Sequence, residues 1–533
     1  MCRQSRRRRR GGNVRGCPEC IGNRRNATVR LDKLLERLEY EVAQGSDQTE
    51  VTTLVNDSRK VEKGSVFVCI SGAVSDGHKF AQDVVEKGAA ALVVEKDVEV
   101  PEDVTVIRVP DTRYALALMS AAYFGYPAEK LKIIGITGTK GKTTTTYMIK
   151  SILEGVGHKV GLIGTIEAVI GDRKIPAANT TPESYTIHQY FAEMAEAGCD
   201  SVVMEVSSQG LMLHRTAGIP FEIGIFTNLG HDHIGPNEHK DFDDYKRCKG
   251  LLFKQCRLGI ANVDDKYFRD VFQGSTCRVE TFGFSDEADL RAENVQLVSR
   301  PGYLGVAYHV AGLMDFDVEI DIPGTFSVYN SLTAIAVCRH FQVPVDKIKE
   351  ALRKAKVKGR IEMVKVSDDF TLMIDYAHNA MSLESLLTTL KEYHPKRLVC
   401  LFGCGGNRSK DRRYEMGEVS GRLADLTIIT SDNPRFEEPQ AIIDDIKIGI
   451  GKTDGKYVEI CDRKEAIKYA IGHGQPGDVI VLAGKGHEDY QEIRGVKHPM
   501  DERVLIAEVL EELKAEKEEK KAENEDKQEQ GTV

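Results

Sequence analysis

One stretch of this chain constrains its fold more than any other: KIIGITGTKGKTTTTY, residues 132–147. Its apolar start, with three isoleucines, predicts a short buried strand, and the glycines that follow predict a tight turn. The segment from Lys142 to about Gly155 is compatible with a helix. A strand, a glycine-rich turn and a helix N-terminus in this order predict a loop that binds polyphosphate, because inward-turned backbone N–H groups and the helix dipole attract anions.

Two side chains of this loop are suited to phosphate and metal. In such loops the lysine, here Lys142, reaches the β- and γ-phosphates, and the hydroxyl that follows, here Thr143, coordinates Mg²⁺. Ile136 stands where the strict G-x-x-x-x-G-K-[ST] pattern has its first glycine. The loop is therefore a variant of that pattern.

The length of the chain predicts about three domains, since 533 residues are too many for one core. Alternating strand and helix signals over residues 29–126 predict a small α/β domain. Residues 127–357 contain the phosphate loop and further buried β-branched strands, which predict a mostly parallel sheet. Residues 358–510 repeat a strand–loop–helix order and predict a doubly wound α/β domain. We therefore predict a three-domain α/β protein.

The two ends of the chain differ from these domains in composition. Residues 1–28 are rich in arginine, lack hydrophobic periodicity and predict a disordered basic extension. This extension is either a nucleic-acid-binding arm or an addition upstream of a natural start near Val29, and we favour the second. The whole chain has a net charge of −9, and its first 30 residues have a net charge of +9, so the remaining residues have a net charge of −18. This negative charge argues against DNA or RNA binding by the remaining residues. Residues 511–533 predict a frayed helix or a solvated charged tail.

No apolar run approaches the roughly 18 residues of a membrane span, and no signal peptide is evident, so we expect a cytoplasmic protein. The twelve cysteines are scattered along the chain, and we expect them to be mostly reduced. Cys17 and Cys20 could form half of a zinc site. No second pair follows at finger spacing, so metal binding there is the less favoured interpretation.

Polar residues follow the predicted strands of the central domain. Glu205 and His233 each come just after a buried strand, at the sheet edge where the phosphate loop lies. A carboxylate and an imidazole at this edge are suitable Mg²⁺ ligands. A single histidine is more often structural, but the pair Asp232 and His233 beyond a strand of a nucleotide domain favours the ligand. On its own, Lys249 has the pattern of a solvated helix lysine.

The motifs taken together resemble those of the Mur ligases. The resemblance covers residues 31 to about 506 and is to the members that add the third residue of the peptidoglycan stem peptide. Each motif is weak by itself, but their joint order over three domains is specific. The motifs are TGTKGKTT (137–144), NTTP (179–182), EVSS (205–208), HR (214–215), TNLGHDH (227–233), DYAH (375–378), FGCGGNR (402–408), SDNPR (431–435) and AGKGHE (483–488).

The resemblance implies an ATP-dependent carbon–nitrogen ligase of peptidoglycan synthesis. ATP would phosphorylate the D-glutamate carboxylate of UDP-N-acetylmuramoyl-L-alanyl-D-glutamate, and the amine of a diamino acid would attack the acyl phosphate. Phosphorylation is needed because an unmodified carboxylate oxygen is a poor leaving group. Two Mg²⁺ ions and Lys142 would stabilise the developing charge. We expect only these small molecules as partners, with no nucleic acid and no membrane, and a monomeric protein.

The resemblance also implies roles for individual residues. It implies that Lys249 is carbamylated, which turns a cation into a carboxylate-like metal ligand. The implied catalytic residues are Lys142, Glu205, His233 and Lys249, and the metal ligands are Thr143, Glu205, His233 and Lys249. The implied ATP site comprises Gly138, Thr139, Lys140, Gly141, Lys142, Thr143, Thr144, Asn330 and Arg360. The implied UDP-sugar site comprises Ser58, Thr180, Thr181, Ser207 and Arg215. The implied diaminopimelate site comprises Arg413, Asp432, Asn433, Pro434, Arg435, Gly484 and Glu488.

The identity of the amino acid has two interpretations within the family. The Asp-Asn-Pro-Arg form of residues 432–435 resembles the version selective for meso-diaminopimelate, because Arg435 can pair with a distal carboxylate that lysine lacks. The lysine-adding version is the alternative. A further alternative is the folate polyglutamylating enzyme of the same superfamily. That alternative does not explain the N-terminal domain that contains Asp57-Ser58-Arg59.

Overall fold

The computed structural model describes residues 28–72, 75–231, 234–235, 238–300 and 302–530. Its contacts divide the chain into two compact units. The first comprises Met1–Ala128, Glu183–Ala192 and Met212–Gly218. The second comprises Glu129–Pro182, Glu193–Leu211 and Ile219–Val533.

The first unit is built on a five-stranded sheet with apolar residues on both faces. Along β6, Ala91 and Val93 enter one core cluster, while Leu92 and Val94 enter another. Burial of both faces is typical of parallel strands covered by helices. The sheet order is β2 (Glu41–Gln44), β7 (Thr105–Arg108), β6 (Ala91–Val94), β5 (Val66–Val68) and β4 (Leu54–Val55), with only β2 antiparallel. The other elements are β1 (Val29–Arg30), β3 (Glu50–Val51), α1 (Leu31–Leu34), α2 (Ala81–Glu86) and α3 (Thr112–Tyr123).

The central sheet of the second unit has eleven strands, and its middle is parallel. Pairs from β9 to β16 run parallel, and the pairs at the two ends of the sheet run antiparallel. The order is β11 (Arg173–Pro176), β10 (Glu167–Ile170), β9 (Val160–Ile163), β12 (Ser201–Glu205), β8 (Lys132–Thr137), β13 (Phe221–Phe226), β14 (Cys256–Asn262), β15 (Arg278–Gly283), β16 (Leu290–Arg300), β17 (Tyr303–Gly312) and β18 (Phe316–Ile320).

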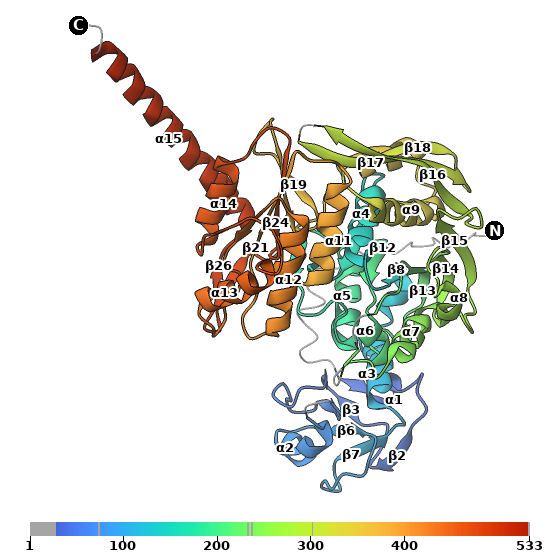
Figure 1. Ribbon diagram of the computed structural model, residues 1–533. Helices are drawn as coiled ribbons and strands as arrows, with labels where there is room; N and C mark the ends of the chain where they lie inside the picture. The colour runs from blue at the N-terminus through green and yellow to red at the C-terminus, as the bar shows by residue number, and fades with distance from the viewer. Residues whose placement is uncertain (1–27, 73–74, 232–233, 236–237, 301, 531–533) are drawn as a thin grey trace, which may run out of the picture. The chain divides into compact units, whose positions relative to one another are not determined.

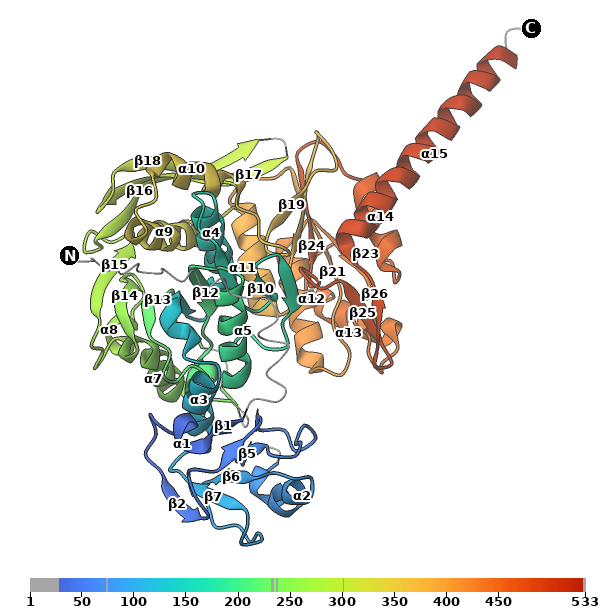
Figure 2. The same cartoon turned by 180° about the vertical axis from the view of Figure 1, so that it is seen from behind.

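The predicted strand, loop and helix at residues 132–155 are confirmed. β8 is buried except for Lys132, and α4 (Lys142–Glu154) begins directly after the glycine loop and is capped by Gly155. Figures 1 and 2 both show α4 beside α9 (Thr325–His340), and the two helices share the core of the sheet. The remaining helices of residues 184–354 are α5 (Ser184–Glu196), α6 (Ser208–Met212), α7 (Phe242–Gly250), α8 (Phe268–Val271) and α10 (Val345–Lys354).

A six-stranded sheet follows, with helices on both faces. Side chains of β24 alternate between two cores: Val481 packs in the core that includes α11 to α13, and Ile480 packs in the core of α14 and α15. The order is β19 (Glu362–Val364), β20 (Thr371–Asp375), β24 (Asp478–Ala483), β21 (Arg397–Phe402), β22 (Leu426–Ile429) and β23 (Tyr457–Glu459), with only β19 antiparallel. The helices are α11 (Ala380–Lys391), α12 (Lys410–Leu423), α13 (Pro439–Ile450), α14 (Arg463–Gly472) and α15 (Glu502–Gln530), and β25 (Tyr490–Ile493) and β26 (Val496–Pro499) form a hairpin.

These sheets confirm the predicted fold class: a small α/β domain, a mostly parallel central sheet and a doubly wound C-terminal sheet. The domain limits at residues 126, 357 and 510 stay predictions. Of the two alternatives for the C-terminal tail, the structure has the helix, since α15 continues to Gln530 and extends away from the sheet (Figures 1 and 2). The basic extension lies outside the described residues except for residue 28. No helix among the described residues is long and apolar enough to cross a membrane.

A buried ion pair joins α14 to α15. Arg463 and Glu502 are 1% and 0% exposed, and their side chains approach to 2.8 Å. We expect Arg463→Met to lower the free energy of unfolding by about 3–5 kcal/mol, because it leaves a buried carboxylate without its cation. Adding Glu502→Leu should recover most of this loss. Urea unfolding of both variants measures the difference, and a loss below about 1 kcal/mol in the single variant would contradict the expectation.

Candidate active site

The phosphate loop is packed too closely for any residue but glycine at two positions. Gly138 has φ +150°, and a Cβ atom there would lie 1.9 Å from Thr227 Oγ1. Gly141 has φ +87°, and its Cβ would lie 2.5 Å from Asn330 Oδ1. Asn330 in turn accepts a hydrogen bond from Thr145 Oγ1 at 3.3 Å. The predicted loop residue Gly141 and the predicted nucleotide residue Asn330 are therefore neighbours.

The end of β13 holds the loop in place. Asn228 accepts the Thr139 N–H through its carbonyl oxygen and the Lys140 N–H through Oδ1, both at 2.9 Å. Thr227 Oγ1 donates to Lys140 O at 2.8 Å. Lys142 Nζ donates to Gly138 O at 2.8 Å and to Thr139 O at 3.1 Å. The loop is thus fixed by a strand that follows it by about 90 residues.

Glu205 lies beside the loop as a nearly buried carboxylate, 1% exposed. It accepts hydrogen bonds from Thr143 Oγ1 at 3.1 Å, from Thr165 N at 2.9 Å and from Thr165 Oγ1 at 2.9 Å. Gly164 makes this approach possible, since a Cβ there would lie 2.6 Å from Glu205 Oε1. All these donors are neutral, and among the described residues no Lys or Arg forms an ion pair with Glu205. A buried carboxylate next to a loop threonine fits a divalent cation, which would supply the compensating charge.

Lys249 is brought to the same loop from α7. Its side chain is 1% exposed, and Nζ donates to Gly138 O at 2.9 Å, the same carbonyl that accepts from Lys142. Nζ also lies 4.5 Å from the centre of the Tyr245 ring. Lys249 is therefore a buried lysine at the phosphate loop rather than a solvated helix residue. His233, the other predicted ligand, lies outside the described residues.

Three of the five residues predicted for the UDP-sugar lie next to Glu205. Thr181 Oγ1 donates to Glu205 O at 3.0 Å and accepts from Ser207 N at 2.9 Å. Thr180 Oγ1 lies 3.1 Å from Thr165 Oγ1. The other two, Ser58 and Arg215, belong to the first unit, where Lys87 Nζ donates to Ser58 O and Arg215 pairs with Glu183 at 2.6 Å.

A second polar cluster forms where β20, β21, β22 and β24 end. Asn433 Nδ2 donates to Glu488 Oε2 at 2.9 Å. Gly484 has φ +107°, and a Cβ there would lie 3.0 Å from Asp432 Oδ2. Arg435 donates from Nε to Glu492 Oε2 at 3.0 Å and from Nη1 to Gly406 O at 2.7 Å. Six of the seven predicted diaminopimelate residues, 432–435, 484 and 488, are therefore brought together.

Arg413, the seventh predicted residue, makes contacts with Glu437 and Asp445. Its side chain is 1% exposed, and its guanidinium donates to Glu437 at 2.7 and 2.9 Å and to Asp445 at 2.9 Å. These carboxylates raise the pKa of Arg413, although burial opposes them. In this structure Arg413 fixes α12 to α13 and to the segment after Arg435. The Arg360 guanidinium lies 5.0 Å from the centre of the Tyr376 ring. The Tyr376 hydroxyl donates to Glu488 of this cluster.

Several residues of the two sites were not singled out from the sequence. Thr165 follows β9 at the same sheet edge as Glu205 and makes three of the contacts described above. Asn228 and Lys485 lie inside motifs that resemble the family, yet no role was assigned to them. Their position after a buried parallel strand was the available signal, since that edge collects ligands.

A further group of metal-ligating side chains lies on and before α7. His239, Asp244 and Cys248 are buried, with ligand atoms within 4.8 Å of one another. Arg247 pairs with Asp244 at 2.7 Å, and His239 Nδ1 lies 3.1 Å from the same carboxylate. Burial raises the pKa of the Cys248 thiol to about 11, so it is protonated at neutral pH. Arg247 already compensates the charge of the Asp244 carboxylate. This favours a structural role for the three residues over metal binding.

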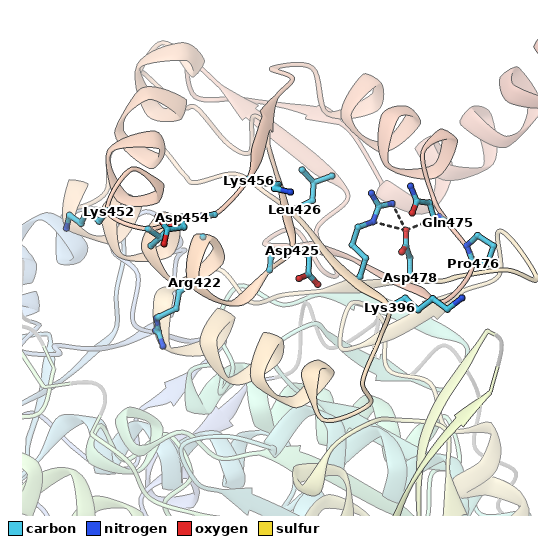
Figure 3. Close-up of a pocket in the computed structure, with 15 residues that line it drawn as sticks. Lys396, Arg422, Asp425, Leu426, Lys452, Asp454, Lys456, Gln475, Pro476 and Asp478 are labelled. Carbon is cyan, nitrogen blue, oxygen red and sulfur yellow. Dashed lines mark hydrogen bonds and ion pairs between the residues drawn. The ribbon is translucent and has the colours of Figure 1, made fainter.

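A cavity of about 900 Å³ lies at the opposite edge of the C-terminal sheet (Figure 3). It lies at the amino ends of β21, β22 and β24, where Arg397 pairs with Asp478. Its rim mixes cations such as Lys396 and Lys456 with acidic residues. Ligands of parallel sheets gather at the carboxyl ends of the strands, so the cavity is separate from the candidate site.

Comparison with known proteins agrees with this geometry. The Mur ligase middle domain matches residues 136–338, the Mur ligase glutamate ligase domain matches 359–486, and the Mur ligase catalytic domain matches 50–124. The chain belongs to the Mur ligase family. This Mur ligase is an ATP-dependent ligase of peptidoglycan synthesis.

Similar relatives are matched over almost their whole length. The UDP-N-acetylmuramoyl-L-alanyl-D-glutamate--2,6-diaminopimelate ligase of Clostridium perfringens (strain 13 / Type A) is 45% identical over 488 residues, 90% of this chain and 99% of that protein. Ligase 1 of the same name from Clostridium acetobutylicum is 45% identical over 488 residues, 91% of this chain and 100% of that protein. A solved structure of a UDP-N-acetylmuramoyl-L-alanyl-D-glutamate--2,6-diaminopimelate ligase has TM-score 0.69 and 28% identity, covering 91% and 99%. All three names are those of ligases, so they give no support to the nucleic-acid alternative.

The close packing of Gly141 gives a direct test of the loop. We expect Gly141→Ala to lower kcat/KM for ATP by about 100-fold, because the new Cβ displaces Asn330 or the loop by tenths of an ångström or more. Steady-state kinetics with varied ATP measures the change.

Gly157→Ala is the matched control. Gly157 has φ +94° but nothing within 4 Å of a Cβ, so it reports backbone strain alone. We expect a stability loss of about 1 kcal/mol with normal ATP kinetics. Equal kinetic losses in both variants would show that strain, and not the contact with Asn330, is responsible.

Proposed function

We propose that this Mur ligase adds meso-2,6-diaminopimelate to UDP-N-acetylmuramoyl-L-alanyl-D-glutamate through an acyl phosphate, with Mg²⁺, as a monomer in the cytoplasm. The names of the relatives support this substrate pair. The observation that carries the choice of amino acid is Arg435, which donates to Glu492 and to Gly406 O. Glu492 in turn donates its N–H to Asn433 Oδ1.

The loop and its helix would bind the triphosphate. The N-terminus of α4, with the backbone N–H groups of residues 141–143, would present donors to phosphate oxygens. The Lys142 ammonium donates to the carbonyl oxygens of Gly138 at 2.8 Å and Thr139 at 3.1 Å. When ATP binds, the ammonium would donate instead to the β- and γ-phosphates. Thr143 and Glu205 would hold Mg²⁺ together with His233. The ion, when bound, neutralises charge on the transferred phosphoryl group.

The surroundings of Lys249 support our proposal that it is carbamylated. Two ammonium groups, of Lys142 and Lys249, donate to the same Gly138 carbonyl, and like charges at such range repel. Attack of neutral Lys249 Nζ on CO₂ forms an N–C bond and releases one proton, giving a carbamate of charge −1. The repulsion then becomes attraction, and a carboxylate-like group lies at the loop for the metal.

The C-terminal cluster would hold the diamino acid by its charges. Diaminopimelate carries two ammonium groups and two carboxylates, and its distal carboxylate distinguishes it from lysine. Arg435 engages Nε and Nη1 with protein oxygens, which fixes the plane of the guanidinium. Glu488 and Asp432 supply acceptors for ammonium groups. A cation fixed next to acceptors suits a zwitterionic end of the substrate.

The deciding experiment is a product assay with purified protein, UDP-N-acetylmuramoyl-L-alanyl-D-glutamate, ATP and Mg²⁺. We expect faster tripeptide formation with meso-diaminopimelate than with L-lysine. The opposite preference would overturn the choice of amino acid, and transfer of glutamate to a folate would favour the folate interpretation.

Arg435→Met should remove most of this preference. Hydrogen bonds to a charged group contribute about 1.5–3 kcal/mol, so kcat/KM for diaminopimelate should fall roughly 10–100-fold, with lysine far less affected. Arg494→Met is the matched control, because the Arg494 side chain is 81% exposed and its ion pair with Glu438 is long, at 4.0 Å. Equal losses for both amino acids would place Arg435 outside the specificity site.

Lys249→Ala should be nearly inactive and partly restored by a short carboxylate such as acetate, which can replace the carbamate. Lys246→Ala on the same helix is the control, since Lys246 pairs with Asp270 at 2.8 Å. ADP release with and without acetate measures the rescue. Full activity of Lys249→Ala without additive would overturn the carbamate.

A further inference from the structure

Lys485 is a fully buried cation within the C-terminal cluster. It follows β24 and is 0% exposed. Its ammonium donates to Glu488 Oε2 at 2.8 Å, to Asn433 Oδ1 at 3.0 Å and to Tyr490 O at 2.5 Å. Asp432 Oδ1 lies 3.8 Å away. An ammonium has three N–H donors, and each has an acceptor here.

The partners of this lysine are not a random set. Burying a lysine is costly unless it is paired and hydrogen-bonded. Asp432, Asn433 and Glu488 are all among the residues expected to contact the incoming diamino acid, and they come from two different strand ends. Lys485 therefore joins the end of β22 to the turn after β24.

Lys485 also determines how the Asn433 amide is oriented. Lysine can only donate, so the oxygen of the amide must face it. The N–H of Glu492 donates to the same Oδ1 at 2.8 Å, which supports this orientation. The amide nitrogen then faces Glu488 Oε2, at 2.9 Å. Two donors therefore occupy Oε2, whereas Oε1 has the Tyr376 hydroxyl at 3.4 Å.

We propose that Lys485 is a positioning residue for the diamino acid: it fixes Asn433 and Glu488 so that Glu488 Oε1 is presented to a substrate ammonium. The inference rests on the proposed function, but not on which diamino acid is used. Lys485 itself does not touch the substrate.

Lys485 keeps Glu488 ionised as well as oriented. Burial pushes the pKa of Glu488 up, but the charge and hydrogen bond of Lys485, with Asn433 and His487, bring it below its usual value. Other ionisable groups near this pair are Tyr376, Asp432, Tyr490 and Glu502. Loss of the lysine would raise the pKa of Glu488, and a protonated carboxyl attracts an ammonium poorly.

The test is Lys485→Met, assayed with the full-length protein and each substrate varied in turn. We expect KM for the diamino acid to rise about tenfold or more, with kcat within about threefold and KM for ATP and for the UDP-sugar unchanged. The acid limb of kcat/KM for the diamino acid should move to higher pH. A purely structural role would not move that limb.

Two variants separate positioning from loss of fold. Arg397→Met breaks the pair with Asp478, whose side chain is 1% exposed, at the opposite edge of the same sheet (Figure 3). It should lose stability without a change in KM for the diamino acid. Lys485→Arg keeps the charge but not the geometry of the ammonium, so KM should rise while the acid limb stays in place; this variant also serves if Lys485→Met does not fold.

Unchanged KM and acid limb in both Lys485 variants would overturn the inference alone. An equal rise of KM in Arg397→Met would overturn it too, since instability would then explain the effect. A wild-type protein that ligates neither diaminopimelate nor lysine would overturn the proposed function and the inference together.

Discussion

β8 pairs in parallel with β12 on one side and with β13 on the other, and the register brings Ile136 opposite Glu205 and Thr137 opposite Phe226. The chain leaves all three strands at the same edge of the sheet. The phosphate loop, the buried carboxylate and the Thr227 segment therefore meet there although 90 residues separate the first from the last. The hydrogen bonds between the loop and Asn228, and between Thr143 and Glu205, follow from this pairing.

Close backbone approach completes the arrangement. Gly138, Gly141 and Gly164 each leave room for a polar side chain that a Cβ would displace. The C-terminal sheet has the same kind of close approach at Gly406, where a Cβ atom would lie 1.9 Å from Pro434 O. Both clusters thus combine parallel strand ends with glycines at the closest contacts. In our proposal, one presents donors to phosphate, and the other presents charges to a zwitterion.

Both clusters contain buried charged side chains, and these differ in the groups that compensate their charge. Glu205 has only neutral donors among the described residues, which suits a metal ion. Lys249 shares a carbonyl with Lys142, and we propose that Lys249 is carbamylated. Lys485 has three acceptors, and Arg413 has two carboxylates, so both are already satisfied by protein groups. We propose a metal ion at Glu205 and a carbamate at Lys249, whereas the partners of Lys485 and Arg413 are protein groups that compensate their charges.

The sequence by itself determined the α/β class, the strand, loop and helix at residues 132–155, and the order of the motifs. These are local properties, because hydrophobic period, glycine turns and helix caps act over a few residues. Only the tertiary structure decided which side chains become partners: Thr165 with Glu205, Lys249 with the loop, Lys485 with Asn433, and Arg413 with Glu437 and Asp445. The physical reason is that such contacts depend on strand register and side-chain packing between segments far apart in the chain, which local patterns do not contain.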